Sequence, residues 1–309
     1  MKRACEIAVS GRHNLLMIGP PGAGKTMIAR RIPGILPEMT EDEALEVTKI
    51  YSVRGLLTES EAWMAERPFR NPHHTITPQG LAGGGMVPGP GEISLAHHGV
   101  LFLDELAEFR RETLEILRQP MEEHCVKLAR LAGNYEFPSD FMLVAAMNPC
   151  RCGYYPDLNR CHCTKGMVEQ YLKKISQPLL DRIDICVETK RVEYQDLIKE
   201  NPHQETSAEI RKRVVAAMER QQQRFAGTNI RYNSRIPAAL LAKYCRLSTK
   251  QKQYMESIYQ KLELTARSYH RILRVARTIA DMDGSDEILT RHLSEAVCYR
   301  NVDKKFWEG

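Results

Sequence analysis

The residues Gly19-Pro-Pro-Gly-Ala-Gly-Lys-Thr26 fit the pattern G-x-x-x-x-G-K-S/T of phosphate-binding loops. The compact apolar run at 14–18 predicts a buried strand before the loop, and helical spacing from Lys25 to Arg31 predicts a helix after it. In that setting, glycine lets backbone N–H groups curl around phosphate oxygens. We expect Lys25 to reach the β- and γ-phosphates of a nucleotide and the Thr26 hydroxyl to bind Mg²⁺. The loop residues expected to contact the nucleotide are Gly19, Pro20, Pro21, Gly22, Ala23, Gly24, Lys25 and Thr26.

Two further apolar strands end in polar residues. Gly99-Val-Leu-Phe-Leu-Asp-Glu105 places Asp104 where its carboxylate would enter the Mg²⁺ shell, and Glu105 where it would orient or deprotonate the attacking water. The alternative is an acidic pair that opens a helix. Asn148 follows the strand predicted at 141–146 and would position the same water, unless it is only a cap or turn residue.

The predicted elements change character along the chain. Strands alternate with helices in the first part, which predicts an α/β fold with a parallel sheet, whereas the second part is all helical. We place the boundary near residues 195–205, between a nucleotide-binding domain at 1–200 and a helical domain at 201–309. The other predicted elements are helices at 2–9, 41–50, 112–121, 206–225, 236–245, 249–263, 267–283 and 290–300, an irregular proline- and glycine-rich segment at 67–91, and a β-hairpin at 126–137 that turns at Gly133-Asn134.

Composition excludes some classes of protein. The 309 residues are 43% hydrophobic and 27% charged, which is typical of a globular protein with about two domains. The net charge of +5 permits binding to nucleic acid, but a mixed, solvated surface explains it equally well. Apolar runs fall short of the ~20 residues that a membrane helix needs. We therefore expect a cytoplasmic protein without a membrane partner, whose cysteines are reduced or bound to metal.

A cysteine cluster follows the third strand. Cys150-Arg-Cys152 and Cys161-His-Cys163 supply four thiolates, which are enough to close a tetrahedral Zn²⁺ site, and His162 is a substitute ligand. The alternative is a group of reduced thiols in a turn.

Several phrases together resemble a known family. GPPGAGKT (19–26), VLFLDE (100–105), AAMNPC (145–150) and PLLDRID (178–184) are similar to the Mg-chelatase-like branch of the AAA+ ATPases. PFRNPHHT (68–75), PGEISLAHHGVLFLDEL (90–106), LRQPMEE (117–123) and NPCRCGYY (148–155) resemble the bacterial ComM/YifB proteins within it. The resemblance implies an AAA+ parallel-sheet core with an insert in helix 2, a β-hairpin before sensor 1, and an all-helical lid domain.

The resemblance also assigns roles to single residues. Asn148 matches sensor 1, Arg182 matches the arginine finger that reaches the ATP of a neighbouring subunit, and Arg267 matches sensor 2 on the lid. Arg271 and Arg274 lie near Arg267 at helical spacing and compete for that role. Taken alone, each arginine would be interpreted as half of a surface ion pair.

Proteins of this family usually carry an N-terminal domain similar to part of the Lon protease. This sequence starts almost at the motor, and the glycine-glutamine stretch that helps to frame the adenine is missing. We therefore expect an excised or truncated motor that keeps its nucleotide chemistry.

Two segments are candidates for contact with a substrate. Lys127 and Arg130 lie on one arm of the predicted hairpin, where they would grip DNA phosphates in the pore of a ring, unless the hairpin is merely solvated. His73 and His74 lie in the segment that matches the helix-2 insert, which would face the pore or the substrate. They lack a third ligand at good spacing, so we do not expect them to bind metal.

Three functions fit these patterns. The first, implied by the resemblance, is a homo-hexameric ring that uses ATP and Mg²⁺ to drive branch migration of DNA. The second is a chelatase-type motor subunit that drives metal insertion, or a remodeller of an unknown protein. The third is a non-catalytic nucleotide-binding module, against which the intact Asp104–Glu105 pair argues.

Overall fold

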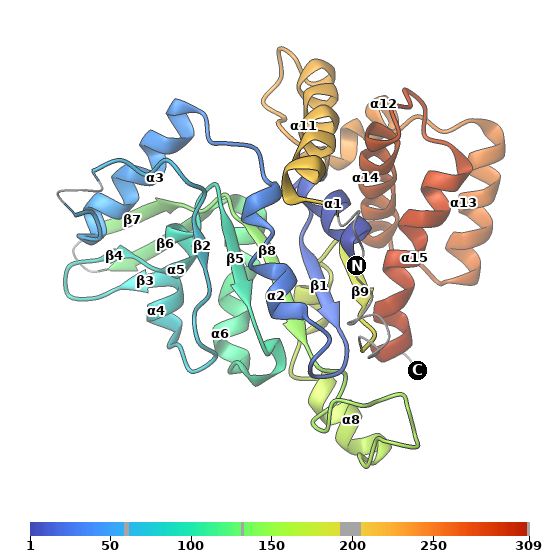
Figure 1. Ribbon diagram of the computed structural model, residues 1–309, viewed down its shortest axis with the longest axis horizontal. Helices are drawn as coiled ribbons and strands as arrows, with labels where there is room; N and C mark the ends of the chain where they lie inside the picture. Colours follow the sequence, from blue (N-terminus) through green and yellow to red (C-terminus); the bar gives the residue numbers. More distant parts are fainter. Residues whose placement is uncertain (59–61, 131–132, 192–204, 308–309) are drawn as a thin grey trace.

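The computed structural model describes residues 1–58, 62–130, 133–191 and 205–307 (Figure 1). Its centre is a five-stranded sheet with the order β2-β5-β8-β1-β9, in which every pair of neighbours is parallel. The strands are β1 (Leu15–Ile18), β2 (Phe69–Arg70), β5 (Val100–Leu103), β8 (Met142–Met147) and β9 (Ile185–Glu188). The predicted parallel α/β core is confirmed, and β2 and β9 are flanking strands that the sequence did not predict.

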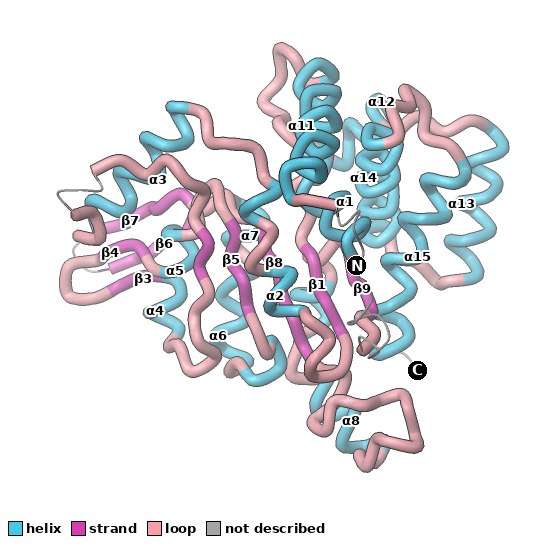
Figure 2. The backbone as a smooth tube through the Cα atoms, viewed as in Figure 1, coloured by secondary structure: helices cyan, strands magenta, loops and turns pink. Residues whose placement is uncertain are grey.

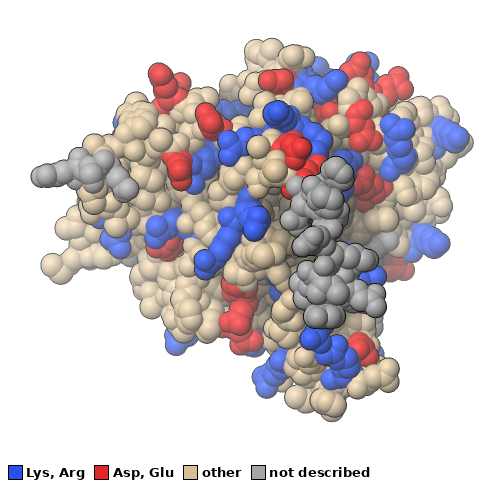
Figure 3. Space-filling view, viewed as in Figure 1, with Lys and Arg blue, Asp and Glu red and all other residues tan. Residues whose placement is uncertain are grey.

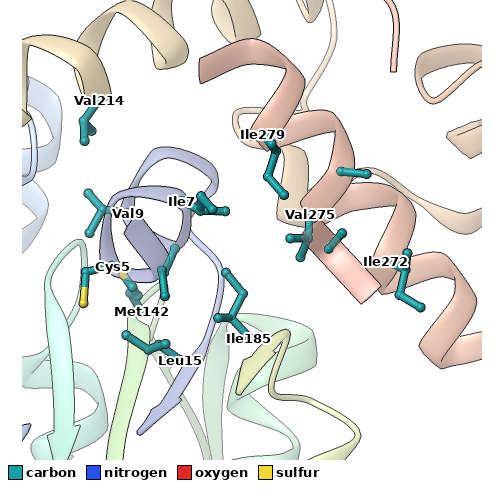
Figure 4. Close-up of a cluster of buried hydrophobic side chains, with 14 of the residues drawn as sticks. Cys5, Ile7, Val9, Leu15, Met142, Ile185, Val214, Ile272, Val275 and Ile279 are labelled. Atoms are coloured by element: carbon teal, nitrogen blue, oxygen red, sulfur yellow. The ribbon is translucent and has the colours of Figure 1, made fainter. Parts of the chain in front are cut away.

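Both faces of the sheet are buried along its three central strands, β5, β8 and β1, which explains why these strands are unbroken apolar runs. In β1, Leu15 and Met17 face one hydrophobic cluster, and Leu16 and Ile18 face another. The first cluster joins the sheet to helices α1 (Lys2–Gly11), α11 (Ser207–Arg224) and α14 (Ala266–Met282), whose apolar side chains meet in Figure 4. The second is covered by the segment 106–123 and by α8 (Lys165–Leu172) and α9 (Gln177–Leu180).

Beyond residue 205 the described chain consists of helices and loops (Figure 2). Capping boxes begin two of these helices: Thr206 with Glu209 at α11, and Ser248 with Gln251 at α13. The other elements are η4 (Asn233–Arg235), η5 (Ala238–Leu240), α12 (Leu241–Tyr244), α13 (Thr249–Lys261) and α15 (Thr290–Trp307). The boundary predicted near 195–205 lies almost wholly in 192–204, outside the described residues.

The proline- and glycine-rich segment at 67–91 is more regular than predicted. After α3 (Glu41–Arg54) the chain forms β2, α4 (Pro78–Ala82), a hairpin of β3 (Gly83–Gly84) with β4 (Gly89–Pro90), and then α5 (Glu92–Leu95). The Thr77 hydroxyl caps α4, and Pro78 suits its first turn. The segment is irregular between these elements, and the prediction missed the elements themselves because they are too short to produce a periodic pattern.

Two other boundaries differ from the predictions. The helix expected at 112–121 is divided into α6 (Arg111–Glu115), η3 (Ile116–Arg118) and α7 (Pro120–Glu123), because Pro120 lacks the N–H that a continuous helix needs. The hairpin consists of β6 (Cys125–Arg130) and β7 (Gly133–Pro138), so Gly133 and Asn134 lie in a strand and not in the turn. The apolar pairs Val126–Phe137 and Leu128–Tyr135 set this register. The remaining short elements are α2 (Lys25–Ala29), η1 (Pro33–Ile35) and η2 (Leu106–Glu108).

Every helix in the described part of the chain is too short or too polar to cross a bilayer. Basic and acidic side chains are interspersed over the face seen in Figure 3, so this face does not present a field of a single sign.

Candidate nucleotide site

The glycine-rich loop turns between the end of β1 and the start of α2, as predicted. Gly24 has φ 75°, a left-handed conformation that favours glycine over any residue with a Cβ. The loop folds around the ammonium group of Lys25, whose Nζ donates to the carbonyl oxygens of Gly19 (2.6 Å) and Pro20 (2.9 Å). Burial lowers the pKa of Lys25, and the nearby Asp104 carboxylate opposes this effect. The positively charged Lys25 ammonium group is therefore held at the centre of the loop that is predicted to bind phosphate.

The predicted metal ligands are in direct contact at the end of β5. The Thr26 hydroxyl donates to Asp104 Oδ2 at 2.6 Å, and the other oxygen of that carboxylate accepts from the Glu105 N–H at 2.9 Å. Hydroxyl and carboxylate oxygens suit Mg²⁺. The two side chains therefore fit this ion.

Asn148 joins the same group from the end of β8. Its Oδ1 accepts from Lys25 Nζ at 3.1 Å. Because β1, β5 and β8 are parallel neighbours, their carboxyl ends lie at one edge of the sheet. The structure therefore brings together Lys25, Thr26, Asp104 and Asn148, with Glu105 adjacent.

The sequence did not reveal a histidine beside Glu105. His74 Nδ1 lies 3.5 Å from Glu105 Oε2, and the ring of His74 packs against that of His73 with centroids 4.1 Å apart. The sequence suggests both histidines as candidate metal ligands and as part of a segment that faces the pore or the substrate, but not as partners of Glu105. His74 lies thirty-one positions before Glu105, and the two-residue strand β2 that brings it there leaves no pattern in the sequence.

The two predicted arginines lie at the opposite edge of the sheet. Arg182 and Arg267 line one cavity of about 670 Å³ together with Asn14, Asp140 and Asp184, which lie one or two residues before β1, β8 and β9. The described lining of this cavity includes none of residues 19–26. The structure therefore does not bring either arginine to the phosphate loop of its own chain.

Acceptors within the chain surround the Arg182 guanidinium. Its nitrogens donate to the carbonyl oxygens of Arg118 (3.1 Å) and Pro178 (2.6 Å), and a third nitrogen pairs with Glu122 Oε1 at 2.5 Å. Arg267 is exposed at the start of α14. The cavity is strongly basic; its lining arginines are Arg12, Arg182, Arg231, Arg235, Arg267, Arg271 and Arg274.

Comparison with protein families identifies the chain. The model for magnesium chelatase subunit ChlI matches residues 1–197, and the model for its C-terminal part matches residues 204–300. The chain belongs to the magnesium chelatase family. The predicted resemblance to the Mg-chelatase-like AAA+ proteins is thereby confirmed.

Curated relatives of this family member are bacterial. It is 45% identical over 303 residues to the protein YifB of Escherichia coli, and 43% identical over 299 residues to the competence protein ComM of Haemophilus influenzae. These alignments cover 98% and 97% of this chain but 59% and 58% of the relatives. The chain thus spans about three fifths of the length of the curated relatives that it matches.

The four cysteines of this family member converge as the spacing predicted. Cys150 Sγ lies 3.3 Å from Cys152 Sγ and 3.7 Å from Cys161 Sγ, and all four sulfurs, including that of Cys163, lie within 4.8 Å of one another. The four side chains are free thiols, and none is exposed. They fit a tetrahedral metal ion.

A second group with possible metal ligands is better explained by hydrogen bonds. Glu46 Oε2 lies 3.0 Å from His97 Nε2 and 2.7 Å from His98 Nε2. His97 Nδ1 accepts from the Asp140 N–H at 2.9 Å, so the ring proton lies on Nε2 and points at Glu46. A protonated Nε2 is unable to bind a metal. The three side chains therefore join α3 to the turn before β5.

The predicted DNA contacts lie on the β6–β7 hairpin of this family member. Lys127 is half exposed, and its Nζ pairs with Glu123 at 2.8 Å. Arg130 ends β6 opposite Gly133. The hairpin is confirmed, while the role of these two residues in binding DNA stays a prediction.

Proposed function

We propose that this chain is a Mg²⁺-dependent ATPase motor. One observation carries the proposal: at the ends of three adjacent strands, Lys25 contacts Asn148 while Thr26 contacts Asp104. Lys25 would bind the β- and γ-phosphates, Asn148 would hold the attacking water, and Glu105 would accept its proton. Thr26 and Asp104 would hold Mg²⁺, which would neutralise charge on the transferred phosphoryl group.

A second cavity supports adenine nucleotides as ligands. This cavity, of about 620 Å³, adjoins the phosphate loop through Met27 and Ile28 and extends to Cys5 of α1 and Ile210 of α11. Its mostly apolar lining suits a planar base. These residues would pack against the faces of the base.

Turnover in this proposal requires a ring of identical subunits. Arg182 and Arg267 line the basic cavity at the amino ends of the strands, away from the phosphate loop of their own chain. A head-to-tail ring, for which we propose six subunits, would apply the basic edge of one subunit to the nucleotide of the next. A guanidinium in that place stabilises charge on the transferring phosphoryl group.

We propose DNA as the substrate of the motor. A relative that is 43% identical is named a competence protein. The resemblance described under Sequence analysis implies branch migration of DNA. Lys127 and Arg130 on the β6–β7 hairpin are the proposed phosphate contacts. The alternative is a chelatase-type motor subunit, which the magnesium chelatase family model favours.

A structural Zn²⁺ ion completes the proposal. Cys150, Cys152, Cys161 and Cys163 would hold one ion per chain, since four converging thiolates are typical of closed zinc sites. Elemental analysis of the natively purified protein would give about one zinc atom per chain. A chain that contains no zinc and takes none up would contradict this part.

The test is ATP hydrolysis with and without single-stranded or forked DNA. We expect stimulation of several-fold that decreases as salt is added, because phosphate contacts are screened. Lys127→Ala should weaken the stimulation. Lys173→Ala serves as the control, because Lys173 is also an exposed lysine paired with a glutamate four positions earlier. Basal hydrolysis without any response to DNA would favour the chelatase-type function or a protein substrate. Turnover that survives Lys25→Ala would refute the ATPase site itself.

A further inference from the structure

The cysteine-bearing loop lies against the phosphate loop. Residues 148–164 connect β8 to α8 without a helix or strand, and they run close to the turn between β1 and α2 (Figure 1). A Cβ atom placed on Gly153 would lie 2.5 Å from Cδ of Pro21. Gly153 has φ 86° and donates its N–H to the Cys150 carbonyl oxygen at 3.0 Å. The two loops therefore touch with no room for an additional methyl group.

The shape of the cysteine-bearing loop depends on its sulfur atoms. Cys152 Sγ lies 3.5 Å from Cys161 Sγ, and the Tyr155 N–H points at Cys150 Sγ at 3.4 Å. Four thiolates around Zn²⁺ with bonds of about 2.3 Å would have sulfur–sulfur separations of about 3.8 Å. Thiols alone are weak hydrogen-bonding groups. A bound ion would therefore be the strongest link between the first and second cysteine pairs.

A second connection leads from the cysteines to the nucleotide site. Cys150 follows Asn148 by two residues and is fully buried. The Asn148 side chain accepts from Lys25 at 3.1 Å. The same short segment therefore contacts the phosphate loop at Lys25 through Asn148 and at Pro21 through Gly153.

We propose that zinc bound by the four cysteines is a structural effector of the nucleotide site, which holds the phosphate loop in its binding shape. The proposal rests on the ATPase function argued above. The zinc ion does not contact the nucleotide; it fixes the segment that supports Pro21 and positions Asn148. Loss of zinc would loosen this support and weaken nucleotide binding without removing any residue that touches the phosphates.

The experiment compares the whole chain with and without zinc. Protein as purified, protein stripped with a zinc chelator that is then dialysed away, and stripped protein resupplied with ZnCl₂ would be titrated with a fluorescent ATP analogue and Mg²⁺. We expect stripping to weaken nucleotide affinity on the order of tenfold, because small displacements of positioning groups have large effects. Resupplied zinc should restore the affinity.

Two variants distinguish the effect of the zinc ion from the effect of the contact between Gly153 and Pro21. Cys161→Ser should lose zinc and nucleotide affinity together, and Cys298→Ser is the control because Cys298 is exposed and outside the cluster. Gly153→Ala should keep zinc but lose affinity, since its new methyl group meets Pro21. Equal affinity in zinc-loaded and stripped wild type would overturn the inference and leave the ATPase proposal standing. Zinc-loaded wild type that does not bind Mg-ATP would instead overturn the ATPase proposal.

Discussion

Replacing Arg182 by alanine should leave ATP binding intact and nearly abolish hydrolysis. Arg182 lies at the amino ends of the strands, whereas Lys25 lies at their carboxyl ends. The four residues of β1 that separate the two edges rise about 13 Å, which exceeds the reach of one arginine side chain. Within one chain the guanidinium therefore does not reach the phosphate loop, and in the proposed ring it would serve the nucleotide of another subunit.

The size of the effect follows from the role of the guanidinium. An arginine supplied in trans to a transferring phosphoryl group increases the rate about 10³- to 10⁵-fold, which corresponds to roughly 4–7 kcal/mol of barrier. Phosphate release would measure hydrolysis, and a fluorescent ATP analogue would measure binding. Arg110→Ala is the control because Arg110 is an exposed arginine that pairs with a neighbouring residue, Glu112.

Mixing subunits makes the in-trans role testable. Arg182→Ala protein has an intact phosphate loop, and Lys25→Ala protein has an intact Arg182, so each is inactive alone. In a ring of head-to-tail contacts, a 1:1 mixture would restore both groups at roughly a quarter of the interfaces. Recovery of hydrolysis on mixing is the expected result. Mixed rings that form but stay inactive, or an Arg182→Ala protein with near-normal turnover, would refute the reasoning.

Three more predictions follow from single contacts. Glu105→Gln should retain ATP through gel filtration while hydrolysis falls about 10²- to 10⁴-fold, since the general base is lost. Glu122→Gln should increase the hydrolysis rate at low protein concentration, because it releases Arg182 from its ion pair. Hydrolysis rates measured over a range of protein concentrations would show this, and rates equal to those of wild type would contradict it. Burial raises the pKa of Asp184, but His13 and Arg271 lower it further, to about 2. Because the pKa of Asp184 is lower in the folded state, its ionised carboxylate contributes about 2 kcal/mol to the free energy of unfolding above pH 4. This contribution is lost as the pH falls to about 2. Urea titrations should show that the difference in free energy of unfolding between wild type and Asp184→Asn decreases over that pH range.

The nucleotide loop and its partners were predictable because each follows a strongly apolar strand. The runs before Gly19, Asp104 and Asn148 are buried on both faces and are neighbours in the sheet. A buried parallel strand leaves a continuous hydrophobic pattern, and its carboxyl end is the natural site for a ligand. Their positions at the ends of apolar strands were therefore enough to predict that these residues lie together.

The edge on which the arginines lie was not predictable. Arg182 and Asp184 lie just before β9, whose four residues Ile185–Glu188 give too short a pattern to distinguish a strand from a loop. Without that strand, the sequence does not show that Arg182 lies at the amino edge. The contact between His74 and Glu105 was hidden for the same reason, since it depends on the two residues of β2.

Helix α1 has a mechanical consequence for such a motor. Its residues Ala4 to Gly11 are all buried, and Gln221 of α11 donates to the Ser10 carbonyl oxygen at 2.7 Å. Just beyond it, His13 contacts Thr278 of α14 at 2.8 Å, and the chain then enters β1 and the phosphate loop. A shared close-packed core of this kind transmits displacement instead of absorbing it. In the proposed ring, each subunit would thus rotate as one rigid body, and the conformational changes driven by ATP would occur at the interfaces between subunits.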